Sequence, residues 1–219
     1  MIFRNRQQAG QMLAQELSDL ANVEGVLVLG VPRGGVPVAF EIAQHLYAPL
    51  DVFLSRKLGV PGQEELAFGA IAASGSRYIN EEIVAATGLK PEEIEKVTRA
   101  TERKLQERAR IYREGRPPVH VEGRTVILVD DGVATGASMY AAIEALQEMK
   151  PKHLVVAVPV ASTAACNRLR LHVDRLVVLH APEDFYAVGQ FYDDFSQVSD
   201  GEVIDLLRRA DRPGPDKPS

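Results

Sequence analysis

The sequence predicts an α/β fold with a parallel sheet flanked by helices. Several short segments are apolar along their whole length, which is typical of strands buried on both faces. Helix-like segments alternate with them, and this alternation is typical of a parallel sheet covered by helices. The apolar segments lie at 25–30, 124–130, 153–161 and 174–179.

The first half of the chain opens with an amphipathic helix, expected over about 5–21. A second helix is expected to begin near Gly35 or Val36, after the first strand. The segment 49–58 predicts a second strand that ends in two basic residues. Two β-prone runs around "SGS" within 65–80 predict a hairpin.

The second half begins with a long charged helix over 91–115, which has Pro at its start and Gly just past its end. Its role, as a solvated surface element or a dimer contact, stays open. Another helix is expected over 137–149. The helix between the last two strands is expected to be capped by Ser162 or Thr163.

Composition limits the function classes. The chain has 219 residues, 46% of them hydrophobic and 25% charged, as in ordinary globular proteins. A net charge of −5 gives no electrostatic indication of nucleic acid or an anionic membrane as a partner. The lone cysteine, Cys166, excludes an internal disulfide and is expected to be a packing residue. No apolar run reaches the ~18 residues of a membrane span, and a cytoplasmic location is expected.

The most informative stretch is "VILVDDGVATGAS", Val126–Ser138. Asp130 and Asp131 follow an apolar strand, at the edge of a parallel sheet where ligands bind. Burying adjacent like charges is costly unless a ligand or cation compensates. The small-residue loop that follows, at the start of a helix, suits a phosphate. Together these features predict a ligand with vicinal hydroxyls and a phosphate, such as a ribose 5-phosphate.

This stretch resembles the 5-phosphoribosyl 1-pyrophosphate (PRPP) signature of type I phosphoribosyltransferases, which has a hydrophobic strand, two acids and a TG-containing loop. The resemblance implies that Asp130 and Asp131 contact the ribose 2′- and 3′-hydroxyls. It implies that the 5′-phosphate is bound by Ala134, Thr135, Gly136, Ala137 and Ser138. Two other interpretations remain: a response-regulator receiver domain, and two acids that merely cap turns.

A second loop, "GVPRGG", joins the first strand to the next helix. A dinucleotide fingerprint is an alternative, because Asp51 lies ~20 residues on, but Pro32 stands where that motif needs glycine. In the family resemblance this is the pyrophosphate loop, formed by Arg33, Gly34 and Gly35. Glycine would permit a strained backbone there, and Arg33 would supply a bidentate donor.

The basic pair Arg56 and Lys57 follows the second strand, and the family resemblance implies that it binds pyrophosphate. A solvated charge pair is the alternative. The predicted catalytic residues are therefore Asp130, Asp131, Arg33 and Lys57. Mg²⁺ is the expected cofactor, with Asp193 and Asp130 as its candidate protein ligands.

The C-terminal stretch "EDFYAVGQFYDDF" partly resembles the hood of hypoxanthine-type transferases. The resemblance implies that Tyr186 stacks on the base, next to Val188, and that Asp193 lies near the metal. Aromatic stripes are also common in cores, so a structural role is an equal alternative. Ala134 stands where hypoxanthine-guanine enzymes carry a third Asp, which argues against that specificity.

The expected organisation is a single domain over 1–210, with an inserted hairpin and long helix at about 66–115. Terminal segments form a small hood, at about 180–207 on the C-terminal side, and 211–219 is expected to be disordered. The expected function in nucleotide metabolism is transfer of phosphoribosyl from PRPP to a nitrogenous base, with a non-catalytic PRPP-binding regulator as the alternative. The expected partners are PRPP and the base, and a second copy of the chain in a homodimer is a further expectation.

Overall fold

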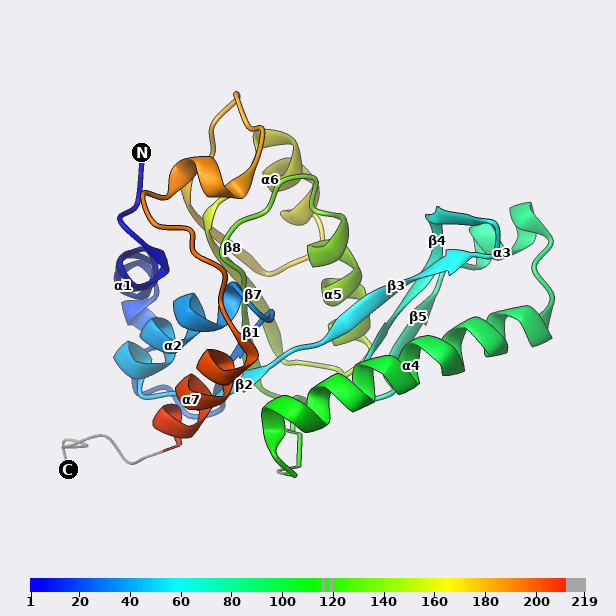
Figure 1. Cartoon of the computed structure of the whole chain (residues 1–219), viewed down its shortest axis with the longest axis horizontal. Coiled ribbons are helices and arrows are strands. Elements are labelled where there is room, and N and C mark those ends of the chain that lie inside the picture. The colour runs from blue at the N-terminus through cyan, green and yellow to red at the C-terminus, as the bar shows by residue number, and fades with distance from the viewer. Residues whose placement is uncertain (116, 119, 212–219) are drawn as a thin grey trace. The chain divides into compact units, whose positions relative to one another are not determined.

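A computed structural model describes residues 1–115, 117–118 and 120–211 (Figure 1). Contacts divide the chain into two compact units. The first comprises the described parts of Met1–Val52, Val119–Gly136 and Pro151–Ser219, and the second those of Phe53–Pro118 and Ala137–Lys150. The single domain over 1–210 remains a prediction, and the predicted disordered tail lies almost wholly outside the described residues.

The first unit contains a five-stranded parallel sheet in the order β2-β1-β6-β7-β8. This confirms the predicted α/β class. Its inner strands are buried along their length because helices cover the sheet. The strands are β1 (Val26–Gly30), β2 (Leu50–Val52), β6 (Thr125–Val129), β7 (His153–Val160) and β8 (Arg175–His180).

The helices of the first unit begin where the sequence indicated. Asn5 caps α1 by accepting a hydrogen bond from the amide of Gln8, and Ser162, rather than Thr163, caps α6. Helix α2 begins at Gly35, one of the two predicted starts. The helices are α1 (Arg6–Glu16), α2 (Gly35–Leu46), α6 (Thr163–Leu169) and α7 (Asp200–Ala210), with short 3-10 turns η1 (Ser18–Leu20) and η2 (Val188–Phe191).

The two terminal segments of the first unit pair with each other. Phe3 forms a parallel bridge with Tyr192, and its amide donates to the carbonyl of Phe191 at 2.8 Å. The rings of Phe3 and Tyr192 lie 5.5 Å apart in a buried cluster that also holds Ala9 and Val160. The segments around Phe3 and Tyr192 are therefore fixed to each other by a backbone hydrogen bond and by apolar packing.

The second unit contains a three-stranded antiparallel sheet in the order β3-β4-β5. The predicted hairpin is present, and the long charged helix begins at Pro91 and ends just before Gly115, which has a φ of 85°. The strands are β3 (Ser55–Val60), β4 (Gln63–Ala72) and β5 (Arg77–Ile79); the helices are α3 (Glu81–Thr87), α4 (Pro91–Arg113) and α5 (Ala137–Gln147).

The predicted strand over 49–58 is wrong. Strand β2 ends at Val52, and the buried residues Phe53 and Leu54 separate it from β3, which belongs to the other sheet. Both halves of the segment are β-prone, and the apolar residues between them concealed the break. Within the residues that the structure describes, no helix is long and apolar enough to cross a membrane.

Helices α1 and α2 pack closely at Gly10, which supports a stability prediction. A Cβ at Gly10 would lie 2.8 Å from the carbonyl oxygen of Val38 and 2.9 Å from Cβ of Glu41. Gly10→Ala should therefore lower the free energy of unfolding by about 1–3 kcal/mol, despite the higher helix propensity of Ala.

The exposed Gly201, at the start of α7, is the matched control. The nearest heavy atom to its added Cβ is Oγ of Ser199, at 3.8 Å. Gly201→Ala should be neutral or stabilising by up to about 1 kcal/mol. Denaturant unfolding measures both variants, and equal effects would contradict the packing argument.

Candidate functional site

The acid pair lies at the carboxyl end of β6, beside the loop that follows β1. Parallel pairing aligns Gly30 with Val129, so the two strands end together. The amide of Val31 then donates to the carbonyl of Val129 at 2.8 Å. The acids Asp130 and Asp131 and the loop 31–35 consequently face each other at the same edge of the sheet.

Gly34 and Gly35 permit this close approach. A methyl group at Gly34 would overlap the Asp131 carboxylate, and one at Gly35 would lie 2.6 Å from the carbonyl oxygen of Val129. Gly34 has a φ of −63°, and Gly35 is the first residue of α2. Neither glycine has a positive φ, so what requires them here is space beside the acids. The peptide bond between Pro32 and Arg33 is cis.

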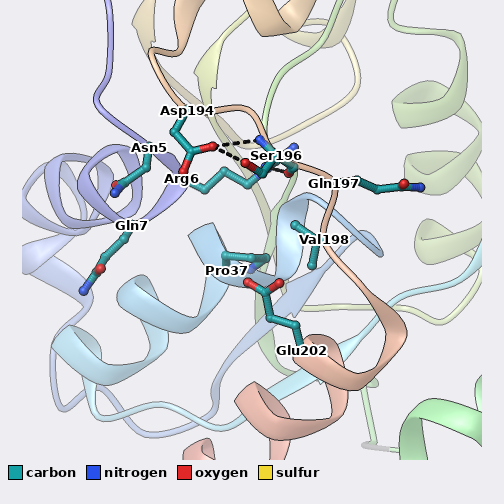
Figure 2. A pocket seen from close by; sticks show the side chains of 9 residues that line it. All are labelled: Asn5, Arg6, Gln7, Pro37, Asp194, Ser196, Gln197, Val198 and Glu202. Carbon is teal, nitrogen blue, oxygen red and sulfur yellow. Dashed lines mark hydrogen bonds between the residues drawn. The ribbon is translucent and has the colours of Figure 1, made fainter.

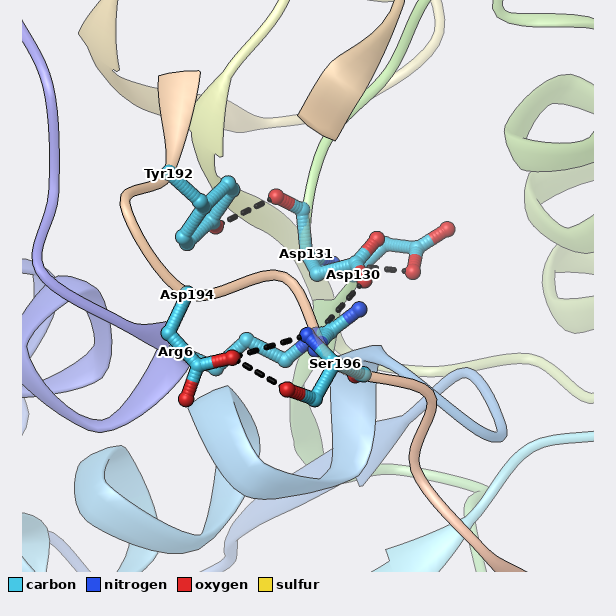
Figure 3. Close-up of polar contacts among 6 residues, drawn as sticks. All are labelled: Arg6, Asp130, Asp131, Tyr192, Asp194 and Ser196. Atoms are coloured by element: carbon cyan, nitrogen blue, oxygen red, sulfur yellow. Dashed lines mark hydrogen bonds and ion pairs between the residues drawn. The ribbon is translucent and has the colours of Figure 1, made fainter. Parts of the chain in front are cut away.

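Arg6 is the cation of the acid pair, and sequence reasoning missed it. Its Nε donates to Oδ2 of Asp131 at 2.8 Å, and one terminal nitrogen donates to the carbonyl of Ser196 at 2.8 Å (Figure 3). Its guanidinium carbon lies 4.0 Å from the ring centroid of Phe195. The first residue of α1 thus connects an acid at the end of β6 with the C-terminal segment.

The two carboxyl groups have different electrostatic environments. Burial raises the pKa of Asp130 well above its ordinary value, and the neighbouring charge of Asp131 raises it further. Burial also raises the pKa of Asp131, but the hydrogen bond and charge of Arg6 oppose that shift. The amide of Asp131 donates to Oδ1 of Asp130 at 2.9 Å. Arg6 therefore compensates mainly one member of the pair.

Tyr192 supports the acid pair from the C-terminal segment. Its hydroxyl donates to the backbone carbonyl of Asp131 at 2.6 Å, and burial raises its pKa. Its ring lies 5.1 Å from that of Phe195, which in turn stacks on Arg6. Tyr192 therefore contacts the backbone of Asp131 directly. Phe195, which packs on Tyr192, contacts the side chain of Asp131 through Arg6.

The predicted phosphate loop follows the acids. Gly136 has a φ of 82°, in the left-handed region that favours glycine, and α5 begins at Ala137 as predicted. Thr135 and Ser138 are exposed. The boundary between the two units falls between Gly136 and Ala137, so the predicted loop residues 134–136 belong to the unit that holds the acids.

Ser162 stabilises this loop, a role that sequence reasoning missed. Its hydroxyl donates to the carbonyl of Ala134 at 2.7 Å while accepting from the amide of Ala165 at 3.1 Å. Its amide also donates to the carbonyl of Val133 at 3.0 Å. The helix cap was the only sequence signal, and it does not reveal the contact with the loop.

The predicted pyrophosphate residues are divided between the two units. Arg33 lies in the first unit, half-buried, with a terminal nitrogen 4.0 Å from Oδ1 of Asp200. Arg56 and Lys57 lie within β3 of the second unit, where Lys57 pairs with Glu65 at 2.8 Å. They do not end a strand of the parallel sheet, which was the basis for predicting them.

The predicted hood residues take different positions. Tyr186 is 88% exposed, and its amide donates to the side chain of Gln190 at 3.0 Å. Val188 packs against Gly132, where an added methyl group would overlap it. Asp193 is exposed, and its amide donates to the carbonyl of Phe3 at 2.8 Å. Their predicted roles in base and metal binding remain predictions.

A surface pocket of about 230 Å³ adjoins Arg6 (Figure 2). Its lining is mainly polar and comes from the starts of α1 and α7, from α2 and from the C-terminal segment. The lining residues are Asn5, Arg6, Gln7, Pro37, Asp194, Ser196, Gln197, Val198 and Glu202.

The chemistry of the acid pair fits a magnesium ion that arrives with a substrate. Mg²⁺ usually keeps several waters and binds one or two carboxylates plus substrate phosphates. Asp130 and Asp131 supply such carboxylates. Among the described residues no group of three or more His, Cys, Asp or Glu side chains could hold a metal ion.

Comparison with known proteins identifies the family. The fold and site define an α/β protein whose candidate site lies at the carboxyl edge of a parallel sheet. The model of the phosphoribosyl transferase domain matches residues 2–196. The chain therefore belongs to the phosphoribosyl transferase domain family.

Two relatives from Mycobacterium tuberculosis, strains CDC 1551/Oshkosh and H37Rv, support this membership. Each is 46% identical over 211 residues, which cover 96% of this chain and 47% of the relative. Both are named provisionally as phosphoribosyl transferases, without a substrate. The chain spans about half the length of these curated relatives.

The crystal structure of TT1426 from Thermus thermophilus is similar over 95% of this chain and 99% of that one, with 44% identity and a TM-score of 0.87. A Neisseria gonorrhoeae protein solved with bound ppGpp shares 13% identity over 95% of this chain and 96% of that one, with a TM-score of 0.50. This second likeness shows the fold alone.

The unequal environments of the two acids give a pH prediction. Because the pKa of Asp130 is raised in the folded state, the folded protein binds more protons than the unfolded one between pH ~4 and the raised pKa, and stability falls as the pH rises through this window. The ionised carboxylate then costs stability. Asp130→Asn should raise the free energy of unfolding at pH 7. The gain should vanish below the unfolded-state pKa of about 3.9, where both states are protonated.

Asp131→Asn is the control. It leaves the guanidinium of Arg6, whose side chain is only 11% exposed, without its carboxylate. At pH 7 this variant should therefore be less stable than Asp130→Asn. Urea unfolding at pH 3, 5 and 7 measures the difference. A gain for Asp130→Asn that persists unchanged at pH 3 would contradict the electrostatic cause.

Proposed function

We propose that this chain transfers 5-phosphoribosyl from PRPP to a nitrogenous base with release of pyrophosphate. The carrying observation is the position of Asp130 and Asp131 between two loops suited to anions. One is the glycine loop at 33–35 and the other begins at Ala134, and both belong to the unit that holds the acids. Membership of the phosphoribosyl transferase family supports this assignment.

In this proposal Asp130 and Asp131 accept hydrogen bonds from the ribose 2′- and 3′-hydroxyls. Two buried carboxylates repel each other in the free protein, and hydroxyl donors would relieve part of the cost of burying them. Two hydrogen bonds hold the pair before binding. One runs from Arg6 to Asp131, and the other from the backbone amide of Asp131 to Oδ1 of Asp130. A pre-positioned diol site lowers the entropy cost of orienting the ribose.

The loop from Ala134 to Ser138 would bind the 5′-phosphate. The left-handed turn at Gly136 suits a loop that turns backbone amides toward an anion, and Thr135 would add a hydroxyl donor from the same unit. Ala137 and Ser138, at the start of α5, stay as further candidates. The hydroxyl of Ser162 donates to the carbonyl of Ala134, so this carbonyl already has a hydrogen-bond partner. This contact therefore favours amides rather than carbonyls at the phosphate.

Arg33 would bind the departing pyrophosphate, with the backbone of Gly34 and Gly35. A guanidinium can donate to two phosphate oxygens at once, and its charge offsets the charge that grows as the bond to C1 breaks. Arg33 is only half-buried and its carboxylate contact is long, at 4.0 Å, so the side chain can turn to a ligand at little cost. Arg56 and Lys57 stay as candidates for the same anion.

When Mg²⁺ is bound, it would neutralise negative charge on the pyrophosphate and ribose oxygens. Asp130 would be its protein ligand, with Asp193 as a further candidate. The chain's own residues would orient the sugar and bind both phosphate groups. Ala134 stands where related enzymes carry an acid, so the proposal assigns no general base, and an acceptor already nucleophilic at neutral pH fits best.

The second candidate function is a PRPP-binding regulator without turnover. The observation in its favour is Ala134, which places no titratable group where hypoxanthine-guanine enzymes carry an Asp. In that case the acids and loops would bind PRPP, and no base would react. Measurement of pyrophosphate release with a panel of bases separates the two candidates. Tyr186 and Val188 are the candidate contacts of the acceptor base. A homodimer is a further part of the proposal.

The proposal requires PRPP binding that depends on Mg²⁺. Calorimetry should show binding in the presence of Mg²⁺ and much weaker binding with EDTA, because the two acids and the pyrophosphate repel one another without a cation. Ribose 5-phosphate, which lacks the pyrophosphate, is the control and should depend less on Mg²⁺. A folded protein that binds no PRPP at millimolar ligand with Mg²⁺ would exclude the proposal.

Arg33→Ala should depress turnover rather than ground-state binding of the sugar phosphate. Loss of one charge-assisted contact costs about 1.5–3 kcal/mol, which corresponds to roughly ten- to hundredfold in kcat. Affinity for ribose 5-phosphate should stay nearly unchanged. Pyrophosphate release in steady state measures the first effect and calorimetry the second.

Asp200→Asn is the control for this variant, because it removes the neighbouring charge and leaves Arg33 in place. It should keep turnover near that of the parent. If Arg33→Ala instead abolishes ribose 5-phosphate binding, then Arg33 belongs to the sugar site or the scaffold. If the parent has no turnover with any base, then a loss of PRPP affinity alone fits the regulator.

A further inference from the structure

Arg6 joins three segments of the first unit. It is the first residue of α1, and it bonds with Asp131 after β6 and with Ser196 in the C-terminal segment. The ring of Phe195 covers its guanidinium at 4.0 Å. Its side chain is 11% exposed and that of Asp131 is 14% exposed, so water screens the ion pair poorly.

The geometry of this contact fixes one particular oxygen. Nε of Arg6 bonds with Oδ2 of Asp131, on the side where Gly34 leaves no room for a methyl group. The carbonyl of Ser196 and the ring of Phe195 fix the plane of the guanidinium. A carboxylate held through Oδ2 by a planar donor of fixed orientation cannot rotate freely. Arg6 does not contact Oδ1, so this oxygen is the candidate acceptor for a ligand hydroxyl, and the side chain of Asp130 is the other group that interacts with this carboxylate.

We propose that Arg6 is a positioning residue for sugar recognition: it orients Asp131 through Oδ2, so that Oδ1 accepts from one hydroxyl of the ribose diol. The inference rests on the proposed function, because it assumes that the acid pair binds this diol. It predicts that selectivity for that one hydroxyl depends on Arg6. The other hydroxyl, which Asp130 would contact, depends on Arg6 much less, since of the two acids it is Asp131 that bonds with the guanidinium.

Another arginine of the same unit makes matching contacts away from the acids. Arg175 bonds with the carboxylate of Asp19 at 2.8 Å and with the carbonyl of Glu16 at 2.7 Å. It therefore repeats the carboxylate and carbonyl contacts of Arg6. Arg175→Ala removes an arginine with these contacts and should leave sugar phosphate binding unchanged.

The test uses calorimetry with ribose 5-phosphate, 2-deoxyribose 5-phosphate and 3-deoxyribose 5-phosphate. In the parent protein, removal of either hydroxyl should weaken binding by roughly tenfold or more, the loss typical of a hydrogen bond to a charged group. In Arg6→Ala one of these two ratios should fall to within about threefold of unity, while the other stays near the parent value. All 219 residues of the chain are used throughout.

Arg6→Lys and Phe195→Leu keep the test decisive if Arg6→Ala does not fold. Lysine retains the charge but lacks the planar fork, so it should restore only part of the affected ratio. Phe195→Leu removes the stacking surface while Arg6 and Asp131 stay, and should lower the same ratio by a smaller factor. A merely structural role of Arg6 would weaken all three ligands by equal factors.

The outcomes separate the inference from the function beneath it. If the parent binds neither ribose 5-phosphate nor PRPP with Mg²⁺, then the proposed function fails. If the parent discriminates against both deoxy sugars and the Arg6 variants keep both ratios, then the inference fails while the function stands. A collapse of both ratios together, or of one in Arg175→Ala, would also overturn it.

Discussion

The close approach of two loops is the constraint on which the candidate site depends. Parallel pairing of β1 with β6 ends both strands at the same level, and the loop 31–35 then lies against Asp130 and Asp131. This approach is possible only because Gly34 and Gly35 lack side chains. The glycine motif and the acid motif are almost a hundred residues apart in sequence, but a side chain at either glycine would collide with the end of β6 or with its acids.

Burial of the two acids carries an electrostatic cost, and the terminal segments offset it more for Asp131 than for Asp130. Both carboxyl groups have raised pKa values because burial disfavours their charge, but only Asp131 has a cation against it. The cation comes from α1, and the groups that hold it come from the C-terminal segment. The segments that the sequence suggested as a hood thus also oppose the rise in the pKa of Asp131 that burial causes.

The sequence predicted what depends on local pattern. The buried strands, the starts of α2 and α4, the hairpin and the position of Asp130 and Asp131 all follow from periodicity, Pro and Gly. The strand over 49–58 failed because a sheet boundary at Phe53 leaves no local polar signal. Arg6 was missed because its partner lies 125 residues away, and nothing in "FRNRQQ" distinguishes it from a solvated helix start. Only tertiary contacts reveal such a residue.

The aromatic C-terminal stretch divides into an exposed part and a buried part, and base binding by the exposed part stays a prediction. Tyr186 is almost fully exposed, whereas Phe191 and Tyr192 are buried against Phe3. The buried pair fixes the N-terminal segment by packing and by the backbone bond from Phe3 to Phe191. Because Arg6 lies just after Phe3, this packing also sets where the guanidinium can reach. The ion pair at Asp131 therefore depends on the core packing of Phe191 and Tyr192. A core role for these two residues does not exclude base binding by Tyr186.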